Sequence, residues 1–379
     1  MMYYKTLKIR LLPTPEQEEL MWKHIYSSRF IWNYLLNIQN ERKERHEYSL
    51  SSYDMIKLLP IIKKQQEYGW LKEVSNTSLQ RVCCDLGWAF KKFFNKSARY
   101  PKFKTRKRSR DSFPICGSAN DLYFLDNSVQ IQKLGKIKYK TDYQLIKGRG
   151  SYQYANPRVS LNNGKWILTV GVKCENQTHN LNGKIGIDLG VKELAIVAFE
   201  DKQIIYHNIN KNKKIKRLKH KIGHLQHIRS RKYKVNGSYE DTKNIIKINK
   251  QIKDIYYHIA CIRNNYLHHI TSEIVSLHPC RVAMEDLNIM GLVKNKRLAT
   301  AIYDECFSEF IRQMKYKCEI NNIDFVQADR FYPSSKTCSC CGHIKKNLKL
   351  TERTYKCDKC GFIIDRDYNA AINLMNYGT

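Results

Sequence analysis

The sequence predicts an α+β chain of several domains, and three observations support this. A helical pattern of apolar residues runs from Thr14 to about Phe94 and gives way near Tyr100 to short alternating strands. The pattern changes again near Gly183, and two C-x-x-C knuckles stand close to the C-terminus. At 379 residues the chain is long enough for two or three domains, each with its own core.

The N-terminal part predicts one strand followed by a block of helices. Tyr3 to Leu12 alternates as a strand. Thr14 to Gln17 has the pattern of a helix start, with a threonine cap, a proline in the first turn and a glutamine three residues after the cap. Helical sequence then continues to about Phe94. Its interior breaks, which predict several helices, lie at Ser51-Ser52, Pro60 and Gly69.

Short strands follow a strongly basic segment. Six of the nine residues from Lys102 to Arg110 are Lys or Arg. Asn162-Asn163-Gly164 is a good hairpin turn between two of the strands. Together with the N-terminal strand they predict a small β-barrel into which the helical block is inserted. The expected strands are 129–131, 137–139, 158–161 and 166–172.

The C-terminal part has the element order of an RNase H-like fold. Three strands are followed by a pair of long helices broken at Asn236-Gly237, then by a strand, a helix from Leu298 to about Ile320, and another strand. The five strands are expected at 185–188, 194–199, 204–207, 282–284 and 323–328. The second long helix has apolar residues at alternating spacings of three and four, which predicts a coiled-coil-like seam. The seam consists of Ile245, Ile248, Ile252, Ile255, Ile259, Ile262 and Tyr266.

Cys338, Cys341, Cys357 and Cys360 predict a zinc ribbon. They form two C-x-x-C knuckles fifteen residues apart, and each knuckle closes on a glycine. Four thiolates can surround one Zn²⁺ tetrahedrally and leave no position for water, so the expected role is structural. Cys340 is an extra thiol, but its spacing to its neighbours in the first knuckle is too short for the knuckle turn.

Three acids stand at the ends of elements in the predicted RNase H-like domain. Asp188 ends the first strand, Glu285 ends a later central strand, and Asp367 opens the last helix. Each acid alone could equally be a turn former, a surface acid or a helix cap. Carboxylates converging from separate elements can hold two Mg²⁺ ions about 3.5–4 Å apart, which is the arrangement that hydrolyses phosphodiesters. The three residues are therefore predicted to bind magnesium and to be catalytic.

The charge of the chain points to a polyanionic partner. Its 67 Lys and Arg residues exceed its 35 acids to give a net charge of +32, and such an excess repels itself unless a nucleic acid offsets it. The expected phosphate contacts lie on the basic side of 211–232 and in the basic segment 102–110. For both segments the alternative is a charged surface that contacts only solvent. In the basic segment 102–110 the expected contacts are Lys102, Lys104, Arg106, Lys107, Arg108 and Arg110.

Other classes of protein are disfavoured. The scattered cysteines, with no signal peptide and no long apolar span, predict a reducing cytoplasm and no membrane attachment. Gly186-Ile187-Asp188-Leu189-Gly190 is also similar to the first phosphate loop of actin- and Hsp70-like ATPases. Those proteins need a second glycine-rich phosphate loop, and the sequence after Val191 offers none.

Nearly end to end, the chain resembles the TnpB (OrfB) proteins of insertion sequences, which are considered ancestors of the type V CRISPR effector nucleases. The most specific matches are Arg330 to Cys338 and Asp365 to Ala371, around the ribbon. The resemblance also covers Pro13 to Gln17, Pro101 to Phe113, Lys133-Leu134-Gly135, Gly186 to Glu193 and Glu285-Asp286-Leu287.

The resemblance implies a transposon-associated, RNA-guided DNA endonuclease. Its fold would be a wedge-like β-barrel (1–12 with 100–180) interrupted by a helical recognition domain (13–99). A RuvC-like nuclease domain (181–379) containing the zinc ribbon (330–362) would follow. The implied partners are a guide RNA from the transposon end and a target double-stranded DNA with a short flanking motif. A separate transposase would act beside it, and the expected location is a prokaryotic cytoplasm, near the nucleoid.

The resemblance also implies residue roles. Asp188, Glu285 and Asp367 would be the RuvC-type triad with catalytic Mg²⁺, and the four ribbon cysteines would bind structural Zn²⁺. Asp365 would be a neighbour of the triad, and Arg366 would orient a carboxylate or contact phosphate. Two other functions stay open: a guide-directed repressor that does not cut, and a strand-transfer transposase. The order Asp-Glu-Asp, where such transposases have Asp-Asp-Glu, disfavours the second.

Overall fold

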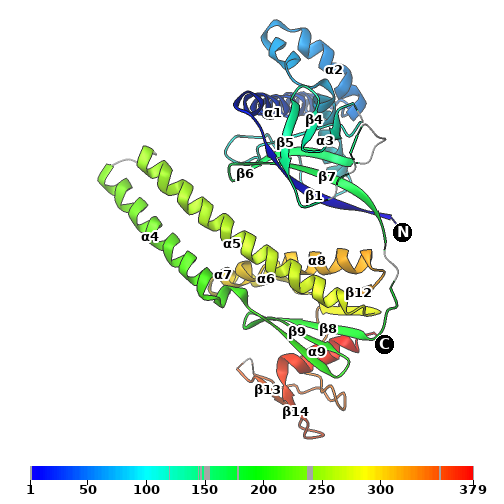
Figure 1. Ribbon diagram of the computed structural model, residues 1–379. Coiled ribbons are helices and arrows are strands. Elements are labelled where there is room, and N and C mark those ends of the chain that lie inside the picture. Colours follow the sequence, from blue (N-terminus) through cyan, green and yellow to red (C-terminus); the bar gives the residue numbers. More distant parts are fainter. Residues whose placement is uncertain are drawn as a thin grey trace. The chain divides into compact units, whose positions relative to one another are not determined.

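The computed structural model describes residues 2–118, 120–143, 145, 147–148, 154–176, 179–236, 242–349 and 351–378. They form two compact units, Met1–Glu175 and Asn176–Thr379 (Figure 1). None of the described helices combines the length and the apolar character needed to cross a bilayer.

Helices dominate the N-terminal half of the first unit. They are α1 (Pro15–Glu44), α2 (Ser52–Lys64), the 3-10 helix η1 (Gln66–Lys72) and α3 (Asn76–Phe94). The predicted start of α1 is confirmed, because Thr14 and Gln17 form a reciprocal capping box. The predicted break at Pro60 is wrong, since this proline lies inside α2. Burial of Met55, Leu59 and Ile62 of α2 in the helical core outweighs the local cost of the proline ring.

The strands of the first unit form one antiparallel sheet in the order β2-β6-β7-β1-β5-β4-β3. The hairpin turn is confirmed, because Asn163 and Gly164 both have positive φ. The strands are β1 (Met2–Leu12), β2 (Ser112–Pro114), β3 (Leu122–Phe124), β4 (Ser128–Ile131), β5 (Gly135–Lys140), β6 (Tyr154–Asn162) and β7 (Lys165–Glu175).

The predicted small β-barrel is not closed among the described residues, because no ladder joins the edge strands β2 and β3. Each of these strands is three residues long and offers few backbone groups for closing a sheet. The long strand β1 lies inside the sheet and pairs with β7 and then with β5. The helices α1 to α3 are therefore inserted in the chain between β1 and β2, which belong to the same sheet.

The second unit contains a five-stranded sheet in the order β10-β9-β8-β11-β12. The first three of these run antiparallel, whereas β11 is parallel to both β8 and β12. This agrees with the predicted succession of elements. The strands are β8 (Lys184–Leu189), β9 (Glu193–Phe199), β10 (Lys202–His207), β11 (Arg281–Glu285) and β12 (Asp324–Ala328).

Helices cover both faces of this sheet (Figure 1). The apolar side chains of α5 (Lys243–Ser276) and α8 (Phe307–Ile320) pack on one face. The helix α9 (Arg366–Met375) packs on the other face, against Ile196 and Ala198 of β9. The short strands β13 (Thr354–Lys356) and β14 (Ile363–Asp365) precede α9 in the chain.

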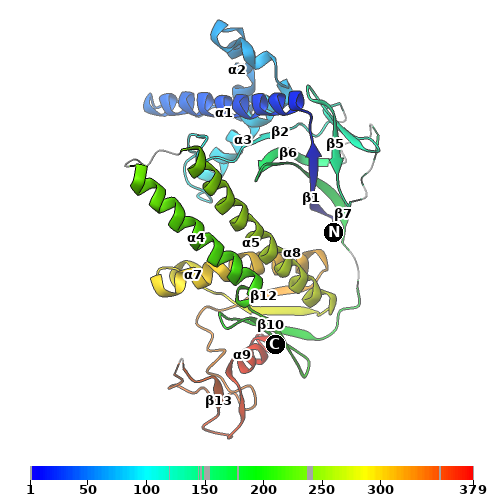
Figure 2. The same ribbon diagram turned by 60° about the vertical axis from the view of Figure 1, so that its left-hand side comes forward.

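The helices α4 (Lys213–Asn236) and α5 lie side by side in both views (Figures 1 and 2). In the chain, the short 3-10 helix η2 (Ile209–Lys211) precedes α4. The predicted seam between them is confirmed, with Ile248, Ile252 and Ile259 of α5 in one apolar cluster with residues of α4. Gly237, part of the predicted break, lies outside the described residues.

The predicted helix from Leu298 to about Ile320 is instead two helices, α7 (Lys296–Glu305) and α8, after the short helix α6 (Ile289–Leu292). Cys306 separates α7 from α8 with φ = 55°, a left-handed conformation. No glycine or proline marks this break, so the sequence carried no signal for it.

Candidate active site and metal centre

Asp188 and Glu285 lie beside each other at the C-terminal edge of two neighbouring parallel strands. The strands β8 and β11 pair with Ile187 opposite Met284, so the next pair in register is Asp188 and Glu285. Ile187 and Met284 belong to the core beneath α5 and α8. Because side chains alternate along a strand, the two acids point to the opposite face, where α9 packs.

Gly186 allows α9 to lie directly on this face. A Cβ atom at Gly186 would stand 1.9 Å from the backbone oxygen of Ala371 and 2.3 Å from the backbone nitrogen of Met375. Asp188 is two residues farther along β8, and Asp367 is one turn before Ala371. The close contact therefore holds the first turn of α9, which carries Asp367, near the two strand-end acids.

The charges of the three acids interact. Burial raises the pKa of Asp188 well above its usual range, and the negative charges of Glu285 and Asp367 raise it further. Burial and the neighbouring Asp365 also raise the pKa of Asp367. Carboxylates held this way repel one another, and a divalent cation would offset that repulsion. Oxygen donors of this kind are those that Mg²⁺ prefers.

Asp365 and Arg366 have contacts of their own. Asp365 caps α9, because its Oδ1 accepts hydrogen bonds from the backbone N–H groups of Asp367 and Tyr368, both at 3.0 Å. The Arg366 guanidinium donates to the backbone oxygen of Lys349 at 3.2 Å. One oxygen of Asp365 is thus engaged in capping, which favours Asp367 over Asp365 as the site residue.

The four ribbon cysteines form a compact cluster. The Sγ atoms of Cys338 and Cys360 are 3.7 Å apart, those of Cys341 and Cys357 are 3.6 Å apart, and all four lie within 4.8 Å of one another. Tetrahedral Zn²⁺ with bonds of about 2.3 Å requires sulfur separations of about 3.8 Å. Cys340 is exposed and outside the cluster. Within the described ranges, no other group of three or more His, Cys, Asp or Glu is this tight, and the three acids are more widely spaced.

A chain of hydrogen bonds connects the ribbon to Glu285. The hydroxyl of Ser334 donates to Oε1 of Glu285 at 2.8 Å. The side-chain amide of Asn373, on α9, donates to the backbone oxygens of Ser334 and Thr337, both at 2.7 Å. Asn369, one turn earlier, also donates to Thr337 at 2.7 Å. These positioning residues had no predicted role, although Ser334 and Asn369 lie within the two conspicuous motifs, Arg330 to Cys338 and Asp365 to Ala371.

Removal of zinc is expected to loosen this region. Cys357→Ser should lower the zinc content below one per chain and speed hydrogen exchange in α9, because the ribbon and α9 share the hydrogen bonds of Asn369 and Asn373. Cys340→Ser is the matched control and should retain its zinc. Zinc analysis and hydrogen exchange measure both effects. One zinc per chain after Cys357→Ser would disprove the ligand assignment.

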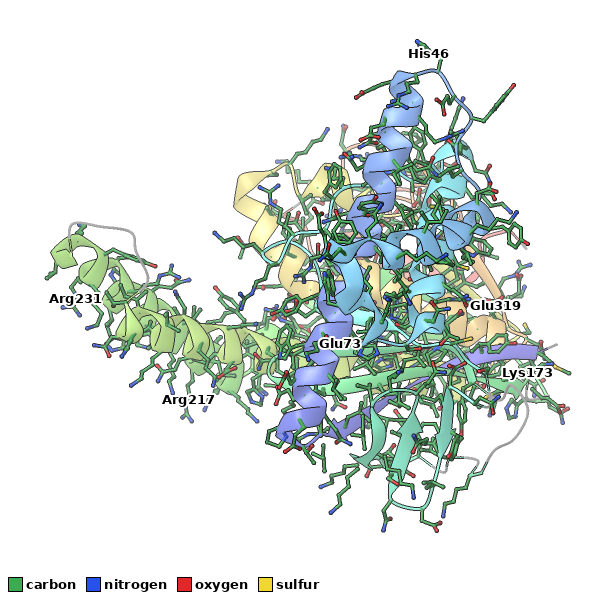
Figure 3. All side chains as sticks on the ribbon, turned by 90° about the horizontal axis from the view of Figure 1, so that it is seen from above. His46, Glu73, Lys173, Arg217, Arg231 and Glu319 are labelled. Atoms are coloured by element: carbon green, nitrogen blue, oxygen red, sulfur yellow. The ribbon has the colours of Figure 1, made fainter. Side chains whose placement is uncertain are left out.

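The predicted phosphate contacts lie in both units. In the basic segment of the first unit Lys104 is half-buried, with its Nζ 3.6 Å from the centre of the Trp32 ring. In the second unit α4 contains no Asp or Glu, and Figure 3 shows Arg217 and Arg231 along this helix. The other five predicted contacts of the basic segment are exposed, namely Lys102, Arg106, Lys107, Arg108 and Arg110.

Three family profiles match the chain. The OrfB_IS605 "Helix-turn-helix domain" matches residues 1–47, the OrfB_IS605 "Probable transposase" matches residues 167–296, and the "Cas12f1-like, TNB domain" matches residues 307–374. The first description does not suit the structure, which has strand β1 and helix α1 in that range. The third profile spans the ribbon and most of α9.

Similar proteins cover almost the whole chain. A Streptomyces pristinaespiralis protein named "Putative RNA-guided DNA endonuclease" is 30% identical over 378 residues, 99% of this chain and 89% of its own length. The Escherichia coli "Putative RNA-guided DNA endonuclease InsQ" is 27% identical over 391 residues, 99% of this chain and 92% of its own. A solved structure titled "mini-RNA-guided endonuclease CRISPR-Cas_phi3" covers 99% of this chain and 92% of that chain, at 11% identity and a TM-score of 0.49, which is too low to assign the fold.

The first of these relatives matches this chain at 30% identity over nearly its full length, and the OrfB_IS605 profiles match two separate segments. The chain therefore belongs to the TnpB (OrfB) family of insertion-sequence proteins.

Proposed function

We propose that this chain is an RNA-guided DNA endonuclease that hydrolyses phosphodiesters at Asp188, Glu285 and Asp367. The observation that carries the proposal is the placement of these acids: Asp188 and Glu285 are in register at the ends of β8 and β11, and Asp367 lies in the first turn of α9, which packs on β8 at Gly186. Residues 181–379 would be a RuvC-like nuclease domain with its ribbon at 330–362. Residues 1–12 with 100–180 would be a wedge domain, and 13–99 a recognition domain.

The three carboxylates would hold Mg²⁺, which when bound supplies an activated water and neutralises the leaving oxygen. The protein's own residues set the geometry. Asp188 and Glu285 project from rigid strand ends, and Ser334 fixes one oxygen of Glu285. Asp365 caps the helix turn that carries Asp367. The four cysteines would hold a structural Zn²⁺, and the ribbon that they close carries Ser334 through the hydrogen bond from Asn373.

The charge distribution supports a guide RNA and a double-stranded DNA as partners. In guide-directed recognition base pairing reads the sequence, and the protein holds the backbones in a positive environment. A net charge of +32 spread over both units suits this division. The proposal includes a guide from the transposon end, a short DNA motif beside the target, action beside a separate transposase, and a place in the cytoplasm near the nucleoid.

The proposal is tested by sequencing the RNA that co-purifies with the protein and building a matched DNA duplex. Protein, RNA and duplex are then incubated with Mg²⁺. We expect cutting of the matched duplex only, and no cutting when Mg²⁺ is left out. Protection of the target from a chemical probe without any cut would favour the repressor, and joining of DNA ends would favour the strand-transfer transposase.

A further inference from the structure

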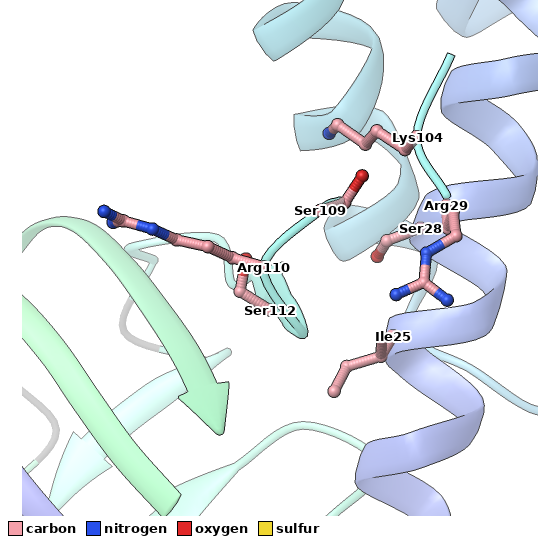
Figure 4. A pocket seen from close by; sticks show the side chains of 7 residues that line it. All are labelled: Ile25, Ser28, Arg29, Lys104, Ser109, Arg110 and Ser112. Atoms are coloured by element: carbon pink, nitrogen blue, oxygen red, sulfur yellow. The ribbon is translucent and has the colours of Figure 1, made fainter. Parts of the chain in front are cut away.

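A pocket of about 250 Å³ lies in the first unit between α1, the basic segment and β2 (Figure 4). Three of its lining side chains are cations, three carry hydroxyl groups, and none is an acid. This composition suits an anion with several acceptor oxygens. The lining residues are Ile25, Ser28, Arg29, Lys104, Ser109, Arg110 and Ser112.

Ser28 supplies a buried hydroxyl that faces this space. It is 5% exposed, and its Oγ has no hydrogen-bond partner among the described protein atoms. Figure 4 shows this oxygen directed into the pocket beside Arg29. A buried hydroxyl left without a partner destabilises a fold, so a ligand at this position would satisfy it.

Two of the lining cations, Arg29 and Lys104, have contacts within the first unit, and the Nζ of Lys104 lies 3.6 Å from the centre of the Trp32 ring. The Arg29 side chain is 13% exposed, and its hydrogen bond to Asp111 at 2.8 Å uses one of several guanidinium donors. The backbone of Lys104 is bound on both sides by the Asn33 amide, at 2.7 and 2.9 Å. Figure 4 shows Arg110 extending away from this group.

We propose that this pocket binds one phosphate group of a nucleic-acid backbone, with Ser28, Arg29 and Lys104 as its donors. The inference rests on the proposed function, because that function supplies the nucleic acid. A guanidinium and an ammonium beside a hydroxyl match the oxygens of a phosphodiester. RNA and DNA offer the same chemistry, so the test has one arm for each.

The test compares Ser28→Ala and Lys104→Gln with Ser27→Ala in the full chain. Ser27 is also buried and also lacks a partner, but it does not line the pocket. Dissociation constants are measured without added Mg²⁺, first for the co-purifying RNA and then for matched duplex binding to the RNA-loaded protein. We expect Lys104→Gln to raise one of these two dissociation constants about tenfold, and Ser28→Ala to raise the same constant about threefold. Ser27→Ala should change neither.

The outcomes are distinct. Weaker RNA binding assigns the phosphate to the RNA, and weaker duplex binding alone assigns it to the DNA. Unchanged constants for both Ser28→Ala and Lys104→Gln in both arms would overturn the pocket assignment. Failure of the wild type to bind either nucleic acid would overturn the proposed function instead. Thermal unfolding checks that each variant folds, and Lys104→Arg, which keeps the charge, should retain most of the affinity.

The pH dependence provides a second readout. Burial lowers the pKa of Lys104 to about 8, Arg158 and Arg29 act in the same direction, and Asp85 opposes them. A bound phosphate favours the charged lysine, so affinity should be full well below pH 8 and fall as the pH rises through about 8. Arginines stay charged and carboxylates stay ionised across this range. Lys104→Gln should abolish this fall, and an identical fall in that variant would contradict the assignment.

Discussion

Asp188→Asn is expected to reduce DNA cutting by about a thousand-fold or more while leaving guide and target binding intact. The substitution keeps the side chain's size but removes a charged ligand from the set formed with Glu285 and Asp367. Single-turnover cutting of a matched duplex measures the effect. Asp201→Asn, at an exposed turn between β9 and β10, is the control and should cut at the wild-type rate.

The same variant separates catalysis from stability. The pKa of Asp188 is raised in the folded state, so the folded protein holds this proton more tightly than the unfolded chain does. The protonated Asp188 therefore adds to the free energy of unfolding below about pH 4, which is the ordinary aspartate pKa. This contribution is lost as the pH rises through the pKa that Asp188 has in the folded protein. At neutral pH and without divalent cations, Asp188→Asn should therefore raise the unfolding temperature. A lower temperature would mean that lost cutting reflects lost folding.

Gly186→Ala is expected to disrupt the second unit, because the new methyl group would overlap the backbone of α9 at Ala371 and Met375. A backbone contact cannot be relieved by rotating a side chain, so α9 must move and take Asp367 with it. Overpacking of this kind costs about 1–3 kcal/mol or more, which corresponds to a fall of about 2–12 °C in the unfolding temperature of a unit of this size. Cutting should be lost as well.

Gly223→Ala is the matched control for this substitution. Gly223 lies within α4, and a Cβ there would meet nothing within 4 Å. Alanine should therefore stabilise the helix, by up to about 1 kcal/mol. Equal unfolding temperatures for wild type and Gly186→Ala would show that α9 does not pack on β8 as closely as described, and the argument for Asp367 would fail with it.

Local patterns explain why much of the second unit could be predicted from the sequence. Alternating strands, the isoleucine seam of α5 and acids at element ends each depend on neighbours in the chain. The break at Cys306 could not be predicted, because a left-handed residue without glycine or proline is imposed by packing. The open sheet of the first unit could not be predicted for a similar reason, because closure into a barrel depends on whether its two edge strands pair with each other.

The candidate site shows the same limit. The acids and cysteines were identified by residue type and spacing, but Ser334 reaches Glu285 across 49 positions in the chain. A serine has no signature for such a contact until the fold places it there. Ser28 is a further case, because a helical serine beside buried apolar residues gives no sequence sign that its hydroxyl faces a pocket.

The most direct test of the account is anomalous diffraction from crystals of the protein soaked in Mn²⁺ as a substitute for Mg²⁺. We predict two ions about 3.5–4 Å apart at the C-terminal edge of β8 and β11, with Asp188, Glu285 and Asp367 each contacting at least one of them. Manganese absent from this edge, or bound there without contact to one of the three acids, would contradict the proposed cutting site.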